Sequence, residues 1–389
     1  MDKQYILGID LSRAFDTVDR SKLMSVLTPI LTNDELRLTR NLLSTTSLSL
    51  RPSAQPKQSF PTNIGVPQGD ALSPVLFIVY LEATLRDVSA SPHLPPNLLS
   101  RTIAYADDAD FICTNPTEME LIIQHAPPIL RTWSLEMNIE KTEYSTLQRQ
   151  PLTPTDTTDV TSWRNCKKLG SLLDDSNDLK RRFTLARSAF HRMWRLWFRR
   201  DLIAETTRLR LYNCYVLPVL TYNCGTWALT QSQLLTLESF HRRQLRALLG
   251  IFYPNHISNE ALFTRCNCEP LRYTLIRARW TLFGHILRRP PDIPANVHML
   301  NYFTAIHIPK WRGGPHITLP VILDRDLSPL QHFLRVRTAE DITNVRRYAN
   351  DKERWRTLTN LIFEHCPPPP HRRQDNEHVP RMRTRPRLV

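Results

Sequence analysis

The chain has 389 residues, a length that allows two or three domains, each with its own hydrophobic core. Hydrophobic residues make up 41% of it and charged residues 23%, which is close to the average of globular proteins and excludes a fibrous or wholly disordered chain. The 51 lysines and arginines exceed the 37 aspartates and glutamates, so the formal net charge is +14 and the surface should attract polyanions such as nucleic acid.

The longest apolar run, over residues 75–81, is too short to span a membrane, and the N-terminus lacks the pattern of a signal peptide. Seven cysteines are scattered through the chain, so we expect reduced thiols in a soluble, intracellular protein without a membrane partner. Cys266 and Cys268 lie near His256 and His285 in the sequence. Their spacing matches no zinc motif, so buried thiols are the stronger interpretation.

The first predicted element is a buried strand over residues 5–11, an apolar and β-branched run that carries Asp10 at its end. A helix is predicted over residues 34–43, where Thr32 and Glu35 can form a capping box. Residues 47–50 then predict a second strand.

A loop over residues 65–70 leads into a predicted long helix, with Ser73 as its N-cap and a proline at the first helical position. Short apolar strands are predicted over residues 102–104 and 111–113. They flank residues 105–108, so the pattern indicates a hairpin whose tip carries two carboxylates.

The second half of the chain is predicted to be mainly helical. Apolar residues recur at helical spacing from Leu179 onward, and helical patterns continue over residues 209–215 and 234–249. Prolines in residues 290–294 mark a boundary. The basic, proline-rich residues 367–389 have little to bury, and we expect them to be disordered.

Asp10, Asp107 and Asp108 are the candidate metal ligands. Nucleotidyl transfer needs two divalent ions a few ångströms apart, and such ions prefer carboxylate oxygens on rigid strand ends. Taken singly, an aspartate is usually a solvated cap, and pairs of aspartates are common in turns. The order and surroundings of the three residues therefore decide between these interpretations.

Three segments follow one another in the chain: Gly8-Ile9-Asp10-Leu11-Ser12-Arg13-Ala14-Phe15-Asp16-Thr17-Val18-Asp19, Gly65-Val66-Pro67-Gln68-Gly69-Asp70-Ala71-Leu72-Ser73-Pro74 and Tyr105-Ala106-Asp107-Asp108. Together they resemble the palm motifs of reverse transcriptases from non-LTR retrotransposons. The resemblance implies an RNA-directed DNA polymerase. In such an enzyme Asp10, the Leu11 carbonyl, Asp107 and Asp108 would bind two Mg²⁺ or Mn²⁺ ions.

The resemblance also implies roles for residues around the metals. Phe15 would lie beneath the sugar of the incoming nucleotide and exclude a ribose hydroxyl, although an ordinary core aromatic fits the same pattern. Gln68 and Gly69 would pack against the nucleotide and template, where a plain turn is the alternative. Lys141 would lie near the triphosphate and protonate the leaving pyrophosphate, whereas a lone lysine is otherwise solvated.

Further residues are expected to contact the primer or other nucleic acid. Residues 168–173, which include Gly170, resemble the hairpin that grips the primer. Tyr105 stands two positions before Asp107 and three before Asp108. Arginines of the first thumb helices can contact phosphates or form a solvated helix face; they are Arg181, Arg182, Arg187, Arg192, Arg195, Arg199 and Arg200. Weaker resemblance continues over residues 222–227, 240–246 and 283–289.

The expected fold is α+β. A polymerase palm, an antiparallel sheet with backing helices, should cover residues 1–173 and a mainly helical thumb residues 174–289. A C-terminal region over residues 290–366 and the tail 367–389 should follow.

Two departures from the resembled family are expected to matter. Its fingers region precedes the first palm motif, whereas only nine residues stand before Asp10 here. We therefore expect an N-terminally truncated chain that lacks the fingers and polymerises poorly alone. Pro127-Pro128 should also interrupt the helix expected before Lys141 and shift that residue.

The implied partners are an RNA template, a DNA primer and deoxynucleoside triphosphates, with a nuclear location if the chain primes synthesis on its target DNA. Two alternatives stay open: an inactive remnant of a retroelement, or a basic RNA-binding module without chemistry. Intact carboxylates at Asp10, Asp107 and Asp108 favour catalysis. The sequence does not predict the oligomeric state.

Overall fold

The computed structural model describes residues 4–44, 46–50, 58–147, 161–162, 165–199, 202–303, 317–330 and 334–366. The chain divides into two compact units, residues 1–178 and 179–389. The first unit combines helices with a mainly antiparallel sheet and the described part of the second is helical apart from its loops, so the predicted α+β class is confirmed. The predicted tail over residues 367–389 lies outside the described residues.

The sheet of the first unit is built around β1 (Gln4–Ser12), the predicted first strand. One side of β1 pairs with β5 (Asp108–Cys113), which pairs in turn with β4 (Thr102–Tyr105). The other side pairs with β7 (Glu143–Leu147) and, at the end of β1, with β6 (Glu136–Met137). These pairs are antiparallel, and β8 (Thr161–Ser162) joins β7 in parallel.

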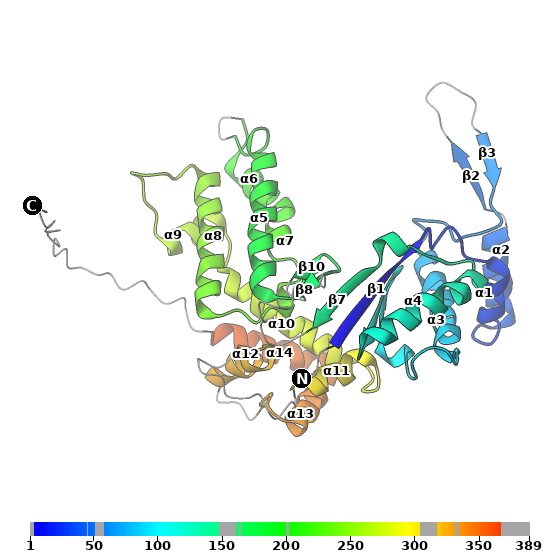
Figure 1. Ribbon diagram of the computed structural model, residues 1–389. Coiled ribbons are helices and arrows are strands. Elements are labelled where there is room, and N and C mark those ends of the chain that lie inside the picture. Colours follow the sequence, from blue (N-terminus) through cyan, green and yellow to red (C-terminus); the bar gives the residue numbers. More distant parts are fainter. Residues whose placement is uncertain are drawn as a thin grey trace, which may run out of the picture. The chain divides into compact units, whose positions relative to one another are not determined.

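Side chains of β1 alternate between the two faces of the sheet, as the pleat of a strand requires. Leu7, Ile9 and Leu11 are buried in the hydrophobic core of the first unit. This core face is covered by α3 (Ser73–Ala90) and α4 (Pro116–Thr132), as Figure 1 shows. The opposite face carries the polar residues of the candidate site.

The N-terminus of α3 differs from the prediction. The helix begins at Ser73 and its N-cap is Leu72, so the assignment of Ser73 as N-cap is wrong by one position. Pro74 occupies the first turn, where its missing N–H costs no hydrogen bond. The Ser73 hydroxyl is buried and has no hydrogen-bond partner among the described residues, because the chain turns into the helix before it can cap.

The prediction that Pro127-Pro128 would interrupt a helix is also wrong. Both prolines lie inside α4, which continues to Thr132. Each proline removes one intrahelical N–H donor. Ile122, Ala126 and Leu130 lie one helical turn apart and are all buried in the core, so packing of this face outweighs the lost hydrogen bonds.

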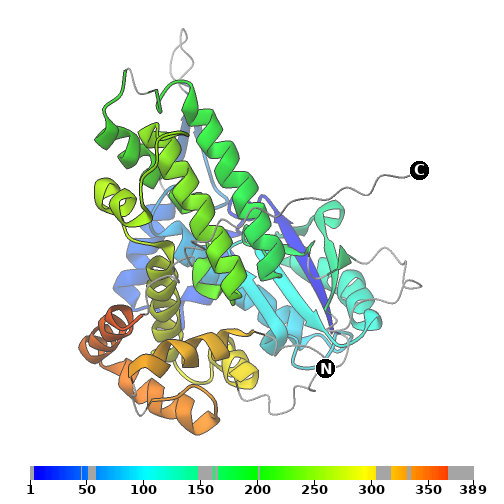
Figure 2. The ribbon, with the colours of Figure 1, turned by 90° about the vertical axis from the view of Figure 1, so that its left-hand side faces the viewer.

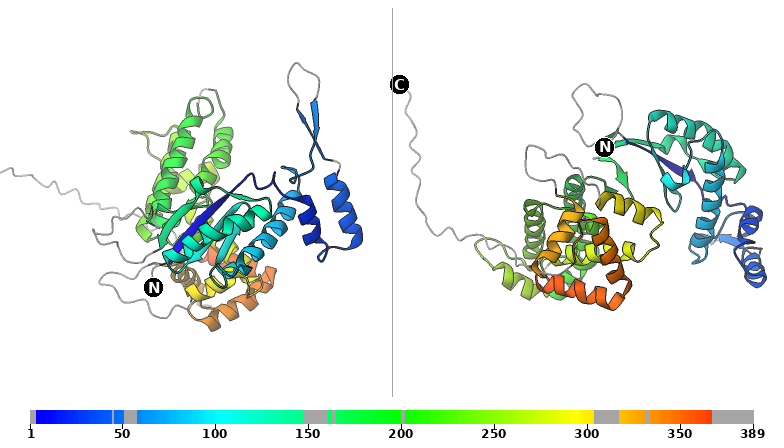
Figure 3. Two further views of the ribbon diagram at one scale, coloured as in Figure 1. Left: turned by 45° about the vertical axis from the view of Figure 1, so that its right-hand side comes forward. Right: turned by 90° about the horizontal axis from the view of Figure 1, so that it is seen from below.

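Two helices and a hairpin follow β1. Asp19 caps α1 (Arg20–Leu27) by accepting from the Ser21 and Lys22 amides. Thr32 and Glu35 form the predicted capping box at α2 (Asn33–Ser44). The predicted strand over residues 47–50 is confirmed as β2 (Ser47–Leu50), which pairs with β3 (Gln58–Pro61) in a hairpin that extends away from the main sheet (Figure 3).

The second unit is a set of helices whose faces form two cores. Its helices are α5 (Asp175–Trp194, which begins at the boundary of the units), α6 (Glu205–Tyr215), α7 (Leu217–Leu220), α8 (Gln231–Leu249), α9 (Asn259–Cys266), α10 (Leu271–Leu287), α11 (Pro294–Phe303), α12 (Leu319–Leu327), α13 (Ala339–Asn350) and α14 (Lys352–Glu364). The predicted helical patterns at residues 209–215 and 234–249 are confirmed in α6 and α8.

Helix α10 links these two cores. Leu275 of α10 packs in the core formed with α5, α6 and α8. In this core α5 and α8 lie side by side and are in contact through the rings of Phe183 and Phe240 (Figure 2). Trp280 and Phe283 of α10 pack in the second core with α11 to α14. No helix in the described part of the chain has the length and apolar composition that a membrane span needs.

Arg20 joins four segments of the first unit. Its Nε donates to the Gly65 carbonyl at 2.9 Å, and its Nη1 donates to the Thr62 carbonyl at 2.7 Å. The same guanidinium group donates to the Leu43 carbonyl and, at 2.9 Å, to the Thr46 hydroxyl. One side chain thus ties the start of α1 to the end of α2, the hairpin and the Gly65 loop.

Substitution of Arg20 by methionine should destabilise the protein by about 2–4 kcal/mol, because several part-buried carbonyl groups lose a charged donor. The measurement is urea unfolding followed by circular dichroism. Arg37→Met on α2 is the matched control, since Arg37 is exposed and has no side-chain partner among the described residues. Equal stabilities of the two variants would contradict the assigned role.

Candidate active site

Asp10 and Asp108 lie directly opposite each other on neighbouring strands. The register of β1 and β5 pairs Asp10 with Asp108 and Gly8 with Asp110. Opposed residues of an antiparallel pair project from the same face, so these carboxylates share the face turned away from the core. Burial raises the pKa of Asp108, and the nearby charges of Asp107, Asp10 and Asp110 raise it further.

The hairpin between β4 and β5 places Asp107 beside this pair. Tyr105 is paired with Asp108, so Ala106 and Asp107 form a two-residue turn. Ala106 has φ of 52°, a left-handed conformation that costs a non-glycine residue roughly 1–2 kcal/mol. The predicted hairpin is confirmed, and Tyr105 is 65% exposed beside it.

Lys141 reaches the carboxylate of Asp10. It ends the short helix η2 (Ile139–Lys141), where the Asn138 side chain accepts from the Lys141 amide at 3.3 Å. The Asn138 amide in turn donates to the Asp10 carbonyl at 2.9 Å. Lys141 Nζ lies 3.1 Å from Asp10 Oδ2, so two of the predicted catalytic residues are in contact.

The donor set of this face suits hard divalent cations. Carboxylate oxygens are the ligands that Mg²⁺ and Mn²⁺ prefer, and crowded like charges are stabilised by a cation. Among the described residues, however, no group of three or more His, Cys, Asp or Glu side chains is already arranged to hold a metal. The carboxylates are thus suitable ligands for a metal ion, but the described side chains are not arranged as a complete set of ligands.

A second lysine, which the sequence reasoning did not single out, neutralises the acids next to the pair. Lys168 Nζ lies 2.7 Å from Asp110 Oδ1 and 3.1 Å from Glu143 Oε2. Burial alone would lower the pKa of Lys168, but these two carboxylates outweigh it and raise the pKa. Gly8 lies between Asp110 and Glu143 in the sheet, and a Cβ there would come within 2.5 Å of the Lys168 ammonium.

Lys168 belongs to the hairpin that was predicted around Gly170. Strands β9 (Lys167–Lys168) and β10 (Ser171–Leu172) pair antiparallel. Leu169 and Gly170 have φ of 47° and 81°, the two positive values typical of a type I′ turn. The ion pairs of Lys168 therefore fasten this hairpin to the main sheet.

The other predicted nucleotide-binding residues lie around the start of α3. Phe15 is half-buried and stacks on Phe77 with ring centroids 4.4 Å apart, so it packs as a core-edge aromatic. Gln68 donates to Asp16 Oδ1 at 3.0 Å. Gly69 is exposed, has φ of 91°, and no atom lies within 4 Å of the position of a Cβ.

Four of the seven arginines predicted to contact phosphates, Arg181, Arg182, Arg187 and Arg192, belong to α5. Arg195 and Arg199 follow this helix, and Arg200 lies outside the described residues. Arg187 is exposed and Arg181 is half-buried. Arg182 is buried, with its guanidinium carbon 4.5 Å from the centre of the Tyr222 ring. The side chain of Arg182 is therefore packed inside the second unit and not on the surface where the prediction put it.

Residues 2–172 match the family model of the reverse transcriptase (RNA-dependent DNA polymerase). The matched stretch contains Asp10, Asp107, Asp108 and Lys141, so it supports a reverse transcriptase domain in the first unit. The comparison with curated proteins gives no match.

The chain also has a weak likeness to solved telomerase structures. For apo telomerase from Candida tropicalis the identity is 12%, the likeness covers 71% of this chain and 46% of that chain, and the TM-score is 0.40. For telomerase from Candida albicans in complex with a TWJ fragment of telomeric RNA, the corresponding values are 12%, 73%, 49% and 0.32. This chain spans less than half of those telomerase chains, and a likeness of this strength carries no argument about function.

The packing of Lys168 over Gly8 makes a quantitative prediction. Gly8→Ala should destabilise the protein by about 1–3 kcal/mol, because its Cβ displaces the ammonium group from Asp110. In a Lys168→Met background, Gly8→Ala should lower the free energy of unfolding by at least about 1 kcal/mol less than in the parent. Urea unfolding of the parent, the two single variants and the double variant measures this difference. Identical costs in both backgrounds would show that Lys168 does not occupy this space.

Proposed function

We propose that the first unit is the catalytic domain of an RNA-directed DNA polymerase of the non-LTR retrotransposon type. The observation that carries the proposal is the placement of Asp10 opposite Asp108, with Asp107 in the adjoining turn. A cluster of like charges on one sheet face costs stability, so its presence favours a functional reason. The family match over residues 2–172 supports the same reaction class.

In this proposal Asp10, Asp107, Asp108 and the Leu11 carbonyl hold two Mg²⁺ or Mn²⁺ ions. Bound ions would neutralise the charge that develops on the transferred phosphoryl group. The chain's own contribution is to hold the carboxylates on paired strands whose register is fixed by the core. Burial and, after it, repulsion from the neighbouring acids raise the pKa of Asp108, and the repulsion would be relieved when cations bind.

Lys141 is proposed to donate a proton to the leaving pyrophosphate, supported by its 3.1 Å contact with Asp10. Its side chain is 65% exposed, so the ammonium group can turn from the carboxylate toward a triphosphate. Phe15 is proposed to select the sugar of the nucleotide, with its ring supported by Phe77. Gln68 and Gly69 are proposed to line the nucleotide and template side of the site.

The proposed partners are an RNA template, a DNA primer and deoxynucleoside triphosphates, in the nucleus if synthesis is primed on target DNA. Tyr105 and Gly170 would contact the primer, and Arg181 and Arg187 the phosphate backbone. Residues 174–289 would act as the thumb, followed by the C-terminal region 290–366. The net charge of +14 suits such a partner.

A second candidate is a nucleic-acid-binding remnant without catalysis. It is favoured by the finding that the described residues hold no ready-made group of three metal-binding side chains. Both candidates bind nucleic acid, so only synthesis distinguishes them.

Primer extension on an RNA template with Mg²⁺ or Mn²⁺ provides that distinction. The chain should incorporate deoxynucleotides slowly, and Asp108→Asn should reduce that rate by roughly a thousandfold or more, because one ligand oxygen is lost. Asp34→Asn, an exposed change on α2, is the matched control and should leave the rate unchanged. Template binding without synthesis would favour the remnant, and synthesis that survives Asp108→Asn would rule out the proposed site.

A further inference from the structure

The second unit contains a groove between α10 and α14, with a volume of about 550 Å³. Arg277 of α10 and Arg288, the C-cap residue of that helix, line one side, and Lys352 and Arg356 line it from α14. One carboxylate, Glu364, lies among the residues that line the groove. The groove therefore has a strongly positive lining, and the proposed polymerase chemistry makes no use of it.

The floor of the groove is rigid because a glycine lets two helices approach closely. Trp355 of α14 packs on Gly284 of α10, where a Cβ would come within 2.3 Å of the indole nitrogen. The indole N–H donates to the Trp280 carbonyl at 3.1 Å. Gly284 lies in the segment 283–289, and Arg288 of the same segment lines the groove.

The cations on α14 are placed against the preference of a helix. Lys352 and Arg356 occupy its first turns, where the positive end of the helix dipole disfavours cations. Both side chains are exposed, and neither forms an ion pair or side-chain hydrogen bond with another described residue. Arg288, across the groove, makes one long hydrogen bond of 3.4 Å to the Ala349 carbonyl. An anionic ligand would stabilise all three groups.

Arg277 lies over an aromatic ring at the other end of the groove. The guanidinium carbon of Arg277 is 4.9 Å from the centre of the Phe363 ring, and Tyr273 packs on the same ring at 4.5 Å. Arg277 also pairs with Glu269 at 3.4 Å, yet 58% of its side chain stays exposed. A guanidinium group placed over an aromatic ring can also stack on a nucleobase.

We propose that this groove binds single-stranded nucleic acid. Phosphates contact Arg288, Lys352 and Arg356, and a base stacks on the outer face of Arg277. Arg277 and Arg288 are 11 positions apart, about 16 Å along the helix axis, which is enough to separate a stacked base from the phosphates. The site lies wholly in the second unit, so it does not depend on the proposed polymerase reaction.

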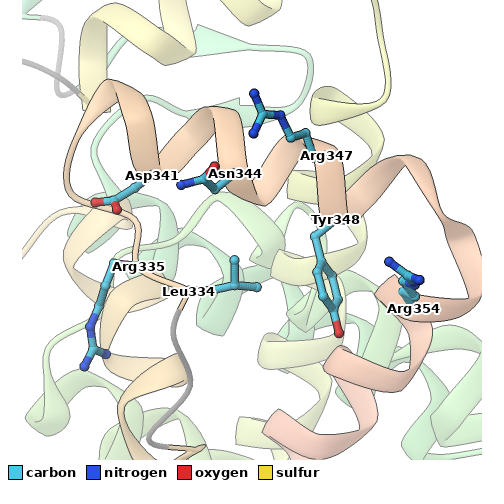
Figure 4. A pocket seen from close by; sticks show the side chains of 7 residues that line it. All are labelled: Leu334, Arg335, Asp341, Asn344, Arg347, Tyr348 and Arg354. Carbon is cyan, nitrogen blue, oxygen red and sulfur yellow. The ribbon is translucent and has the colours of Figure 1, made fainter.

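A second basic cavity along α13 differs in geometry and provides a control. It has a volume of about 370 Å³ and is lined by Arg335, Arg347 and Tyr348, among others. Figure 4 shows that the side chains of Arg335 and Arg347 point away from each other. Neither has a side-chain partner among the described residues, so removing these two charges matches the removal of Lys352 and Arg356.

Fluorescence anisotropy with a labelled single-stranded RNA of 20 nucleotides, or roughly that length, tests the proposal on the full chain. Lys352→Ala/Arg356→Ala should weaken binding at least about tenfold and make the salt dependence shallower by about 1.4 in the logarithmic slope, since two phosphate contacts are lost. Arg335→Ala/Arg347→Ala should weaken binding by less than about threefold. Equal weakening by the two pairs would overturn the proposal.

Two further variants separate the parts of the site. Lys352→Arg/Arg356→Lys keeps both charges and should bind nearly as the parent does, which excludes a folding defect as the cause of the loss. Arg277→Lys keeps the charge but removes the flat surface, so it should weaken RNA binding and leave binding of heparin unchanged. Equal displacement of the RNA by polyglutamate and by unlabelled RNA would instead indicate a site for acidic peptides and overturn the proposal. Asp107→Ala should not alter binding by the groove, so failure of catalysis and failure of this site can be told apart.

Discussion

The concentration of negative charge on one face of the first unit's sheet is the constraint that the rest of the candidate site has to satisfy. Asp10 faces Asp108 across the strand pair, and Asp110 lies two positions further along β5 on the same face. Like charges directly opposite each other in a sheet are destabilising. Two lysines offset this repulsion from different elements, Lys141 at Asp10 and Lys168 at Asp110. Repulsion among the carboxylates thus favours the binding of cations, while the two lysine ion pairs stabilise the folded sheet.

Hydrophobic packing on the opposite face keeps this arrangement in register. A shift of β1 by one residue would turn Leu7, Ile9 and Leu11 to solvent and move Asp10 into the core, which makes the register strongly specified. Arg20 adds a polar constraint, because it fastens the Gly65 loop beside the site. The carboxylates can therefore be crowded without a change of strand pairing.

Elements with a local signal could be predicted from the sequence, including the strand with Asp10, the acidic hairpin and the capping box of α2. Features that depend on distant packing could not. Pro127-Pro128 stays helical because a buried face outweighs two missing donors, and Arg182 is buried by the ring of Tyr222. The contact of Lys168 with Gly8 joins residues far apart in the sequence. The only local signal for it is the alternation of Asp108 and Asp110 in β5, which indicates an acidic face that a cation could neutralise.

Thermal unfolding with and without Mn²⁺ tests whether the crowded carboxylates of this face destabilise the fold and bind metal. Without metal, Asp108→Asn should be more stable than the parent by roughly 0.5–1 kcal/mol, because one like charge is removed. Added Mn²⁺ should raise the Tm of the parent and leave that of Asp108→Asn nearly unchanged, since the ion binds the folded carboxylates. A variant that is less stable without metal, or that gains as much from Mn²⁺ as the parent, would contradict the account.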